Sequence, residues 1–201
     1  MENEPVRDFI PLGIGVQTSG TDPKKHDLIE VAFVSYHNGA RFSIRIRHSD
    51  MNIDLEYCKD FWGTLQHGDA RDADLADEEI DRFLFEQASV QLEDRPAARI
   101  MKLIPMGMNI EKSKSFIEKV LPQTYNHLWH DASVELSTLF AIEGLRDRTE
   151  LAHTHGQYRN RAELKLLTTN GLTPALRDAY IANHILSDFR GESPNWMTGR
   201  T

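Results

Sequence analysis

Few of the side chains that most often do chemistry in proteins stand at spacings that a reaction needs in this sequence. Four histidines are candidates for a transition-metal site: His127, His130, His153 and His155. The last two stand two residues apart without an obvious third ligand, which favours loop residues over a metal site. The single cysteine, Cys58, has no histidine or aspartate at a spacing typical of a catalytic pair, and we interpret it as a buried core thiol.

Gly13 and Gly15 raise a second chemical interpretation, a nucleotide-binding turn. The third glycine and the immediate helix that such a turn requires are both missing. The sequence also holds no Gly-x-Ser-x-Gly elbow and no Walker motif. What stands out instead is the stretch IGVQTSGTDP from Ile14 to Pro23, a polar turn that closes an apolar strand.

The first fifty residues carry strand patterns that would position this turn. Apolar runs cover 9–16 and 28–36, and His37-Asn38-Gly39 is a hairpin signal. The following stretch, RFSIRIRH, alternates strictly: Phe42, Ile44 and Ile46 point to one face, and Ser43, Arg45 and Arg47 to the other. We predict a three-stranded antiparallel sheet with one buried face.

After these strands the apolar period becomes helical, apart from a short strand at 100–107. The predicted helices cover 54–68, 76–93, 110–121, 133–145, 161–169 and 174–189. Thr173 as N-cap and Pro174 as the first helical residue begin the last of them. Helices that alternate with short strands predict an α/β fold, a mixed sheet flanked by helices.

Composition limits the classes of function. The chain has 201 residues, 40% of them hydrophobic, which suits one domain over 1–189, followed by a loose tail at 190–201. In that tail Trp196 is either a docking residue or a covered aromatic. The net charge of −8 opposes non-specific binding to long nucleic acid, although a small basic groove remains compatible with it. No apolar stretch is long enough to cross a bilayer and no secretion signal is visible, so we expect a cytoplasmic protein without a membrane partner.

Four patches, taken in order, resemble one known family. They are IGVQTSGTDPKKHDLIEVAFV, NIDLEYCKDFWGTLQHGDAR, PMGMNIEKSKSFI with HLWHDASVELSTLF, and LTPALRDAYIANHIL. These segments are similar to motifs of the DEDDh 3′–5′ exonucleases of the ribonuclease H-like fold, above all oligoribonuclease and phage-type exodeoxyribonucleases. The resemblance runs roughly from residue 9 to residue 189. It implies a ribonuclease H-like mixed sheet, with three N-terminal antiparallel strands and shorter strands after them.

Enzymes of this family hold two divalent metal ions with four carboxylates, and a histidine acts as general base on the attacking water. The resemblance places the corresponding positions at Gly15, Gln17, Ser113, Thr173 and Asp178, with Ser113 fixed to within one or two residues. Asp178 alone keeps a carboxylate, and Thr173 replaces the base. The charge of the site falls from about −4 to about −1, which removes most of the attraction for two dications about 4 Å apart. We therefore expect no catalytic residue, no metal and no cofactor.

Nearby carboxylates leave an alternative open. Asp22, Glu30 or Glu111 could join Asp178 in a rebuilt site for Mg²⁺ or Mn²⁺ and support an active 3′–5′ exonuclease.

The resemblance also implies positions near a bound strand. Thr18 and Ser19 match the family's turn beside the 3′-terminal nucleotide, and Trp62 and Gln66 would flank the former cleft. The alternative interpretations are a turn that only closes a strand and an aromatic residue that belongs to the core.

Three hypotheses follow. The leading one is a catalytically inactive exonuclease-like domain that acts as a binding or structural module. Its ligand is a single-stranded nucleic-acid end or a protein in a larger assembly, and the acidic charge favours the protein. By analogy alone, the phage-type patch suggests a phage origin and the host cytoplasm. The second hypothesis is the active exonuclease, and the third is an unrelated α+β protein.

Overall fold

Six strands form one mixed sheet in the order β4-β3-β2-β1-β5-β6. A computed structural model describes residues 9–58, 70–89, 102–128, 132–142, 157, 173–191 and 194–198. The strands are β1 (Phe9–Thr18), β2 (Leu28–Ser35), β3 (Arg41–Ile46), β4 (Ala70–Arg71), β5 (Lys102–Gly107) and β6 (Val134–Glu135). The first three pair antiparallel, as predicted, whereas β1 with β5, β3 with β4, and β5 with β6 pair parallel. The fold is an α/β mixed sheet flanked by helices, as the sequence predicts.

The predicted hairpin connects β2 and β3. The Gly39 amide donates to the Ser35 carbonyl, and Gly39 has a φ of 72°, in the left-handed region that glycine adopts without cost.

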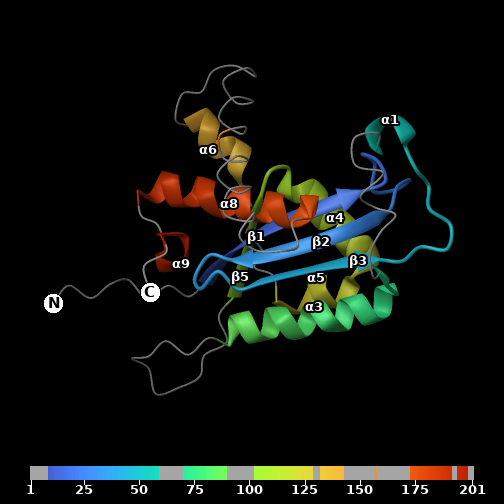
Figure 1. Cartoon of the computed structure of the whole chain (residues 1–201), viewed down its shortest axis with the longest axis horizontal. Helices are drawn as coiled ribbons and strands as arrows, with labels where there is room; N and C mark the ends of the chain where they lie inside the picture. The colour runs from blue at the N-terminus through green and yellow to red at the C-terminus, as the bar shows by residue number, and fades with distance from the viewer. Residues whose placement is uncertain are drawn as a thin grey trace.

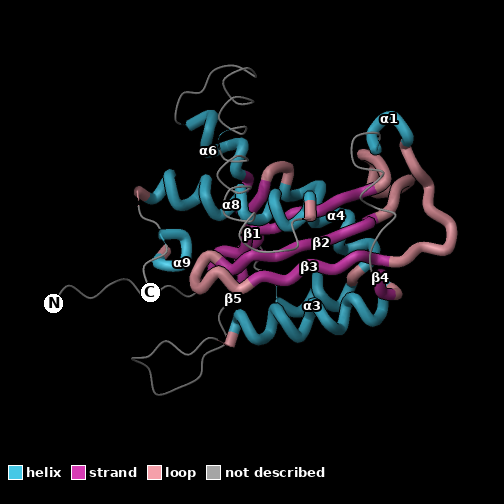
Figure 2. Tube along the Cα trace, in the orientation of Figure 1, coloured by secondary structure: helices cyan, strands magenta, loops and turns pink. Residues whose placement is uncertain are grey.

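Helices cover both faces of the sheet (Figures 1 and 2). One face carries α3 (Ala73–Ala88), α4 (Ile110–Val120) and α5 (Pro122–Leu128), and the other carries α8 (Pro174–Arg190). The shorter helices are α1 (Leu55–Cys58), α6 (Leu136–Ile142) and α9 (Asn195–Thr198). Thr173 begins α8 as predicted, because its hydroxyl accepts a hydrogen bond from the Leu176 amide at 3.2 Å.

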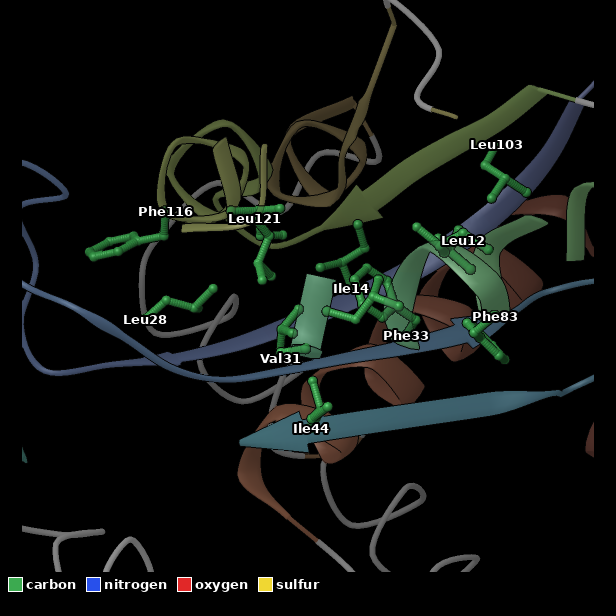
Figure 3. Packing of buried hydrophobic residues seen from close by; sticks show 14 of the residues in the cluster. Leu12, Ile14, Leu28, Val31, Phe33, Ile44, Phe83, Leu103, Phe116 and Leu121 are labelled. Atoms are coloured by element: carbon green, nitrogen blue, oxygen red, sulfur yellow. The ribbon is translucent and has the colours of Figure 1, made fainter. Parts of the chain in front are cut away.

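The larger core lies between the sheet and the α3–α4 layer. Figure 3 shows the strand side chains Leu12 and Phe33 near Phe83 of α3, and Leu28 near Phe116 of α4. The predicted alternation of β3 holds, because Ile44 and Ile46 are buried in this core and Phe42 packs against it. The opposite core joins α8 to the strands, and Ala175 and Ala179 of the helix lie close to Gly13 and Gly15 of β1.

Some elements differ from the sequence prediction. Of the helix predicted over 54–68, the described part ends at Cys58, and the helix predicted over 161–169 lies outside the described residues. The helix predicted from 133 starts instead as β6, with α6 after it.

The tail expected to be loose has a docked segment at 194–198. The Trp196 indole N–H donates to the Tyr36 carbonyl at 2.9 Å, and the ring meets Tyr180 edge-on. The tryptophan also lies so close to Gly39 that a β-carbon there would clash with it. Trp196 is thus partly buried against the core of its own chain.

Candidate functional site: a pocket at the free edge of β1

A pocket opens where β1 extends beyond the end of its parallel neighbour, β5. The pairing of β1 with β5 ends at Gly13 and Met106, and the chain then turns into α4. Beyond Gly13 the edge of β1 on this side has no strand partner among the described residues, and the gap holds a cavity of about 290 Å³. Figure 1 shows α1 beyond the arrowhead of β1, at the same end of the sheet. Ligands of α/β sheets commonly bind at such carboxyl ends of strands.

Three of the five family positions meet in this pocket. Gly15 on β1, Ser113 on α4 and Asp178 on α8 all line it, although they are far apart in sequence. Gln17 is buried on β1, and Thr173 is the N-cap of α8. The convergence of three separate elements is what the resemblance implies for the position of a site.

Gly15 is buried beneath the backbone of α8. A β-carbon on Gly15 would overlap the carbonyl oxygen of Ala175, and one on Gly13 would overlap that of Ala179. The two glycines therefore serve close packing of a helix on a strand rather than a nucleotide-binding turn. An aspartate at position 15 has no room unless α8 moves away.

Glu30 lies behind the pocket in a row of paired residues. Gln17, Glu30 and Arg45 are partners across β1, β2 and β3, so their side chains share the face that α8 covers. Glu30 is fully buried, and neither carboxyl oxygen makes a hydrogen bond in the described structure. Burial raises the pKa of Glu30, and the nearby Asp178 carboxylate adds to this. The Thr173 hydroxyl, which is close to the carboxyl group without the geometry of a regular hydrogen bond, and the Arg45 guanidinium oppose it.

The pocket also holds two cations that the sequence analysis did not single out. Lys112 of α4 and Arg177 of α8 line it together with Asp178. The Arg177 Nε lies 3.4 Å from the Asp178 Oδ1. The sequence signal that could have indicated Lys112 was its position next to Ser113, which the resemblance assigns to the site. A sequence pattern alone does not show which side of α4 faces the strand edge.

Lys112 is half-buried and forms no hydrogen bond or ion pair within the described chain. Its ammonium lies 5.7 Å from the centre of the Tyr57 ring, a cation–π contact. Desolvation lowers the pKa of Lys112. Tyr57, on α1, is 39% exposed and lines the pocket as well.

The two turn residues of the prediction have different surroundings. Thr18 lines the pocket, and its hydroxyl donates to the Gly20 carbonyl at 2.7 Å. The Ser19 hydroxyl is fully buried, accepts from the Asp27 amide and donates to the Asn52 carbonyl. Ser19 thus holds the turn closed. Trp62 and Gln66 lie outside the described residues.

The carboxylates of the alternative site are dispersed. Asp22 accepts from the Lys24 amide in its own turn, and Glu111 is exposed, where it pairs with Lys114 and Ser133. Glu30 alone comes near Asp178. Within the described ranges no three histidine, cysteine, aspartate or glutamate side chains gather so that they could hold a metal ion.

The described residues therefore do not fit a pair of divalent ions. One carboxylate faces the pocket, the β1 position is covered by the backbone of α8, and two cationic side chains would repel a metal.

The remaining candidates fall outside the pocket. Cys58 is buried, as predicted, with its thiol 3.8 Å from the Thr18 carbonyl, and burial and the Asp54 carboxylate raise the pKa of that thiol. His130, His153 and His155 lie outside the described residues, as does the side chain of His127. Among described helices none is long and apolar enough to cross a membrane.

Solved structures of exonuclease I proteins share this fold. A product-bound exonuclease I matches with a TM-score of 0.59 at 14% identity, over 94% of this chain and 45% of its own. The moderately thermophilic exonuclease I from Methylocaldum szegediense matches with a TM-score of 0.55 at 15% identity, over 94% of this chain and 43% of its own. E. coli exonuclease I in complex with a 5cy-dA13 oligonucleotide matches with a TM-score of 0.56 at 12% identity, over 94% of this chain and 42% of its own.

This likeness identifies an exonuclease-like fold, and the chain spans less than half the length of these structures. No protein-family model and no curated protein sequence matches the chain.

Proposed function

We propose that this chain is a catalytically inactive exonuclease-like domain that binds the end of a single-stranded nucleic acid in the β1 pocket. The observation that carries the proposal is the positive charge of the pocket lining, in which the two cations Lys112 and Arg177 outnumber the one carboxylate, Asp178. Such a pocket repels the dications that a nuclease of this fold needs and attracts phosphate instead.

The shape of the pocket supports the same ligand. Its 290 Å³ is near the lower limit of small-molecule sites, about 300–1,000 Å³, so it accepts a terminal nucleotide rather than a folded duplex. Ile14, Val16 and Phe116 supply an apolar wall, and the exposed part of Tyr57 offers a surface on which a base can stack.

The overall charge of −8 restricts this binding to a local site. Without a wide basic face, long strands gain little affinity along their length. A cationic pocket in an acidic body therefore recognises an end and not a continuous strand.

A gel experiment tests the proposal. A 5′-labelled single-stranded oligonucleotide is incubated with the protein and Mn²⁺, and the sample is split between a denaturing and a native gel. We expect an intact strand that shifts on the native gel. Metal-dependent shortening that disappears in Asp178→Asn would contradict the proposal and establish the rebuilt active site. Neither shortening nor shift would also contradict it and would point to a protein partner.

A further inference from the structure

Of the two cations in the pocket lining, Lys112 is the one whose ammonium has no ion-pair partner in the described chain. Its ammonium is half-buried, contacts the Tyr57 ring and forms no ion pair in the described chain. By contrast, Lys114 on the same helix lies 3.3 Å from the Glu111 carboxylate, and Lys119 lies 3.4 Å from Asp27. A partly desolvated cation without a counterion favours an anionic ligand.

The groups around Lys112 define the chemistry of that ligand. Arg177 offers a planar guanidinium of the kind that binds phosphate oxygens, and Ser113 places a hydroxyl in the same lining. The Lys112 ammonium lies over the Tyr57 ring, 5.7 Å from its centre, so a phosphate bound at Lys112 places the attached nucleoside next to an aromatic residue that is partly exposed.

A terminal phosphomonoester suits these cations better than an internal phosphodiester. It carries a charge of about −1.5 to −2 at neutral pH, against −1 for a diester, and it offers three acceptor oxygens. The net positive charge of Lys112, Arg177 and Asp178 together favours the ligand of higher negative charge.

We propose that the β1 pocket is a metal-independent site for a terminal phosphomonoester, carried by a nucleotide or by a nucleic-acid strand. Lys112 and Arg177 bind the phosphate, and Tyr57 stacks on the base. This inference rests on the proposed function and names the group that the pocket recognises. It differs from a nuclease site, where divalent metals bind the phosphate and the strand is cut.

The experiment measures fluorescence anisotropy of a 5′-fluorescein-labelled single strand in EDTA. Strands end in a 3′-hydroxyl or a 3′-phosphate, and unlabelled nucleoside 3′- and 5′-monophosphates compete. We expect the 3′-phosphate strand to bind more tightly than the 3′-hydroxyl strand without any metal. The two competitors show whether the site accepts both positions of the phosphate.

Variants assign the effect to the pocket. We expect Lys112→Gln to weaken binding of the phosphorylated strand about tenfold or more, since a charge-assisted contact is lost. Lys112→Arg keeps the charge and should retain most of the affinity. Lys114→Gln is the matched control, because it removes the same charge from the same helix outside the pocket. A thermal melt of each variant confirms that it is folded.

The outcomes separate the two proposals. Equal affinity of Lys112→Gln and the unsubstituted protein for the phosphorylated strand overturns the phosphate site and leaves end binding intact. Binding of the strand only when Mg²⁺ replaces EDTA overturns the phosphate site and also contradicts the metal-repelling pocket of the proposed function. Lys112-dependent binding of nucleoside monophosphates without binding of any strand supports the phosphate site and contradicts end binding. Absence of binding in every arm overturns both.

Discussion

Glu30 carries a carboxyl group that is fully buried and receives no hydrogen bond from the described residues. Its pKa is raised above the ordinary value of 4.5, chiefly by burial, so the folded protein holds this proton more tightly than the unfolded chain does. The stability that this preference contributes is fully present below pH 4.5 and is lost as the pH rises through the folded-state pKa.

Glu30→Gln should therefore stabilise the protein at high pH. The amide has the shape of the protonated acid and never ionises, so we expect Tm to rise at pH 8 and to change little at pH 4. Each kcal/mol of relieved cost adds about 2–4 °C in a chain of this size. Glu118→Gln, at an exposed position, is the control. A lower Tm of Glu30→Gln at pH 8 would show that an ionised Glu30 is needed, with Arg45 as its partner.

Residue chemistry was only partly predictable from the sequence. The sequence itself shows that positions 15, 17 and 113 carry Gly15, Gln17 and Ser113 in place of carboxylates. The structure brings Gly15 and Ser113 to one pocket. The position of Lys112 in the pocket could not be predicted from the sequence, because it depends on which side of α4 packs against the free edge of β1. The resemblance directed attention to Ser113, the next residue.

The contact between β1 and α8 is the element that decides what the site can contain. Gly15 on the strand lies directly against the backbone of Ala175 and Ala179 on the helix, and Gly13 lies against the Ala179 carbonyl and the Asn183 side chain. The two glycines therefore allow close packing of α8 on β1.

Substitution of Gly15 tests this packing. Gly15→Ala places a methyl group against the Ala175 carbonyl, and we expect it to destabilise the protein by about 1–3 kcal/mol or more. Gly107→Ala is a graded control, because the nearest atom to its β-carbon, the Ile14 carbonyl oxygen, is 3.0 Å away. Thermal or urea melts measure both. If Gly15→Ala melts like the unsubstituted protein, α8 is not seated on the strand as described.

Local patterns predicted elements well where neighbouring residues decide them. The β2–β3 hairpin and the Thr173-Pro174 start of α8 depend on a few adjacent residues, and both are present. The two-residue strands β4 and β6 escaped prediction because they are defined by pairing with distant strands. The separate helix α5 is held partly by Asp77, whose carboxylate accepts from the Gln123 and Thr124 amides 46 and 47 residues away.

At the scale of the whole molecule, an exonuclease-like sheet is combined with a pocket of reversed charge. The sheet order, the strand edge and the position of α8 bring Gly15, Ser113 and Asp178, three of the positions that the resemblance assigns to the metal site, to one pocket. Lys112 and Arg177 make the same place suitable for an anion. We infer that the scaffold keeps the geometry of recognition without the means of cleavage.

Mn²⁺ binding tests this central claim most directly. Bound Mn²⁺ loses the sharp electron paramagnetic resonance spectrum of the free ion, so a titration counts bound ions without requiring any activity. We predict that the free-ion signal is the same with the protein, with Asp178→Asn and with buffer alone. Loss of signal corresponding to two ions per chain, abolished by Asp178→Asn, would contradict the account and show that the pocket holds a metal pair.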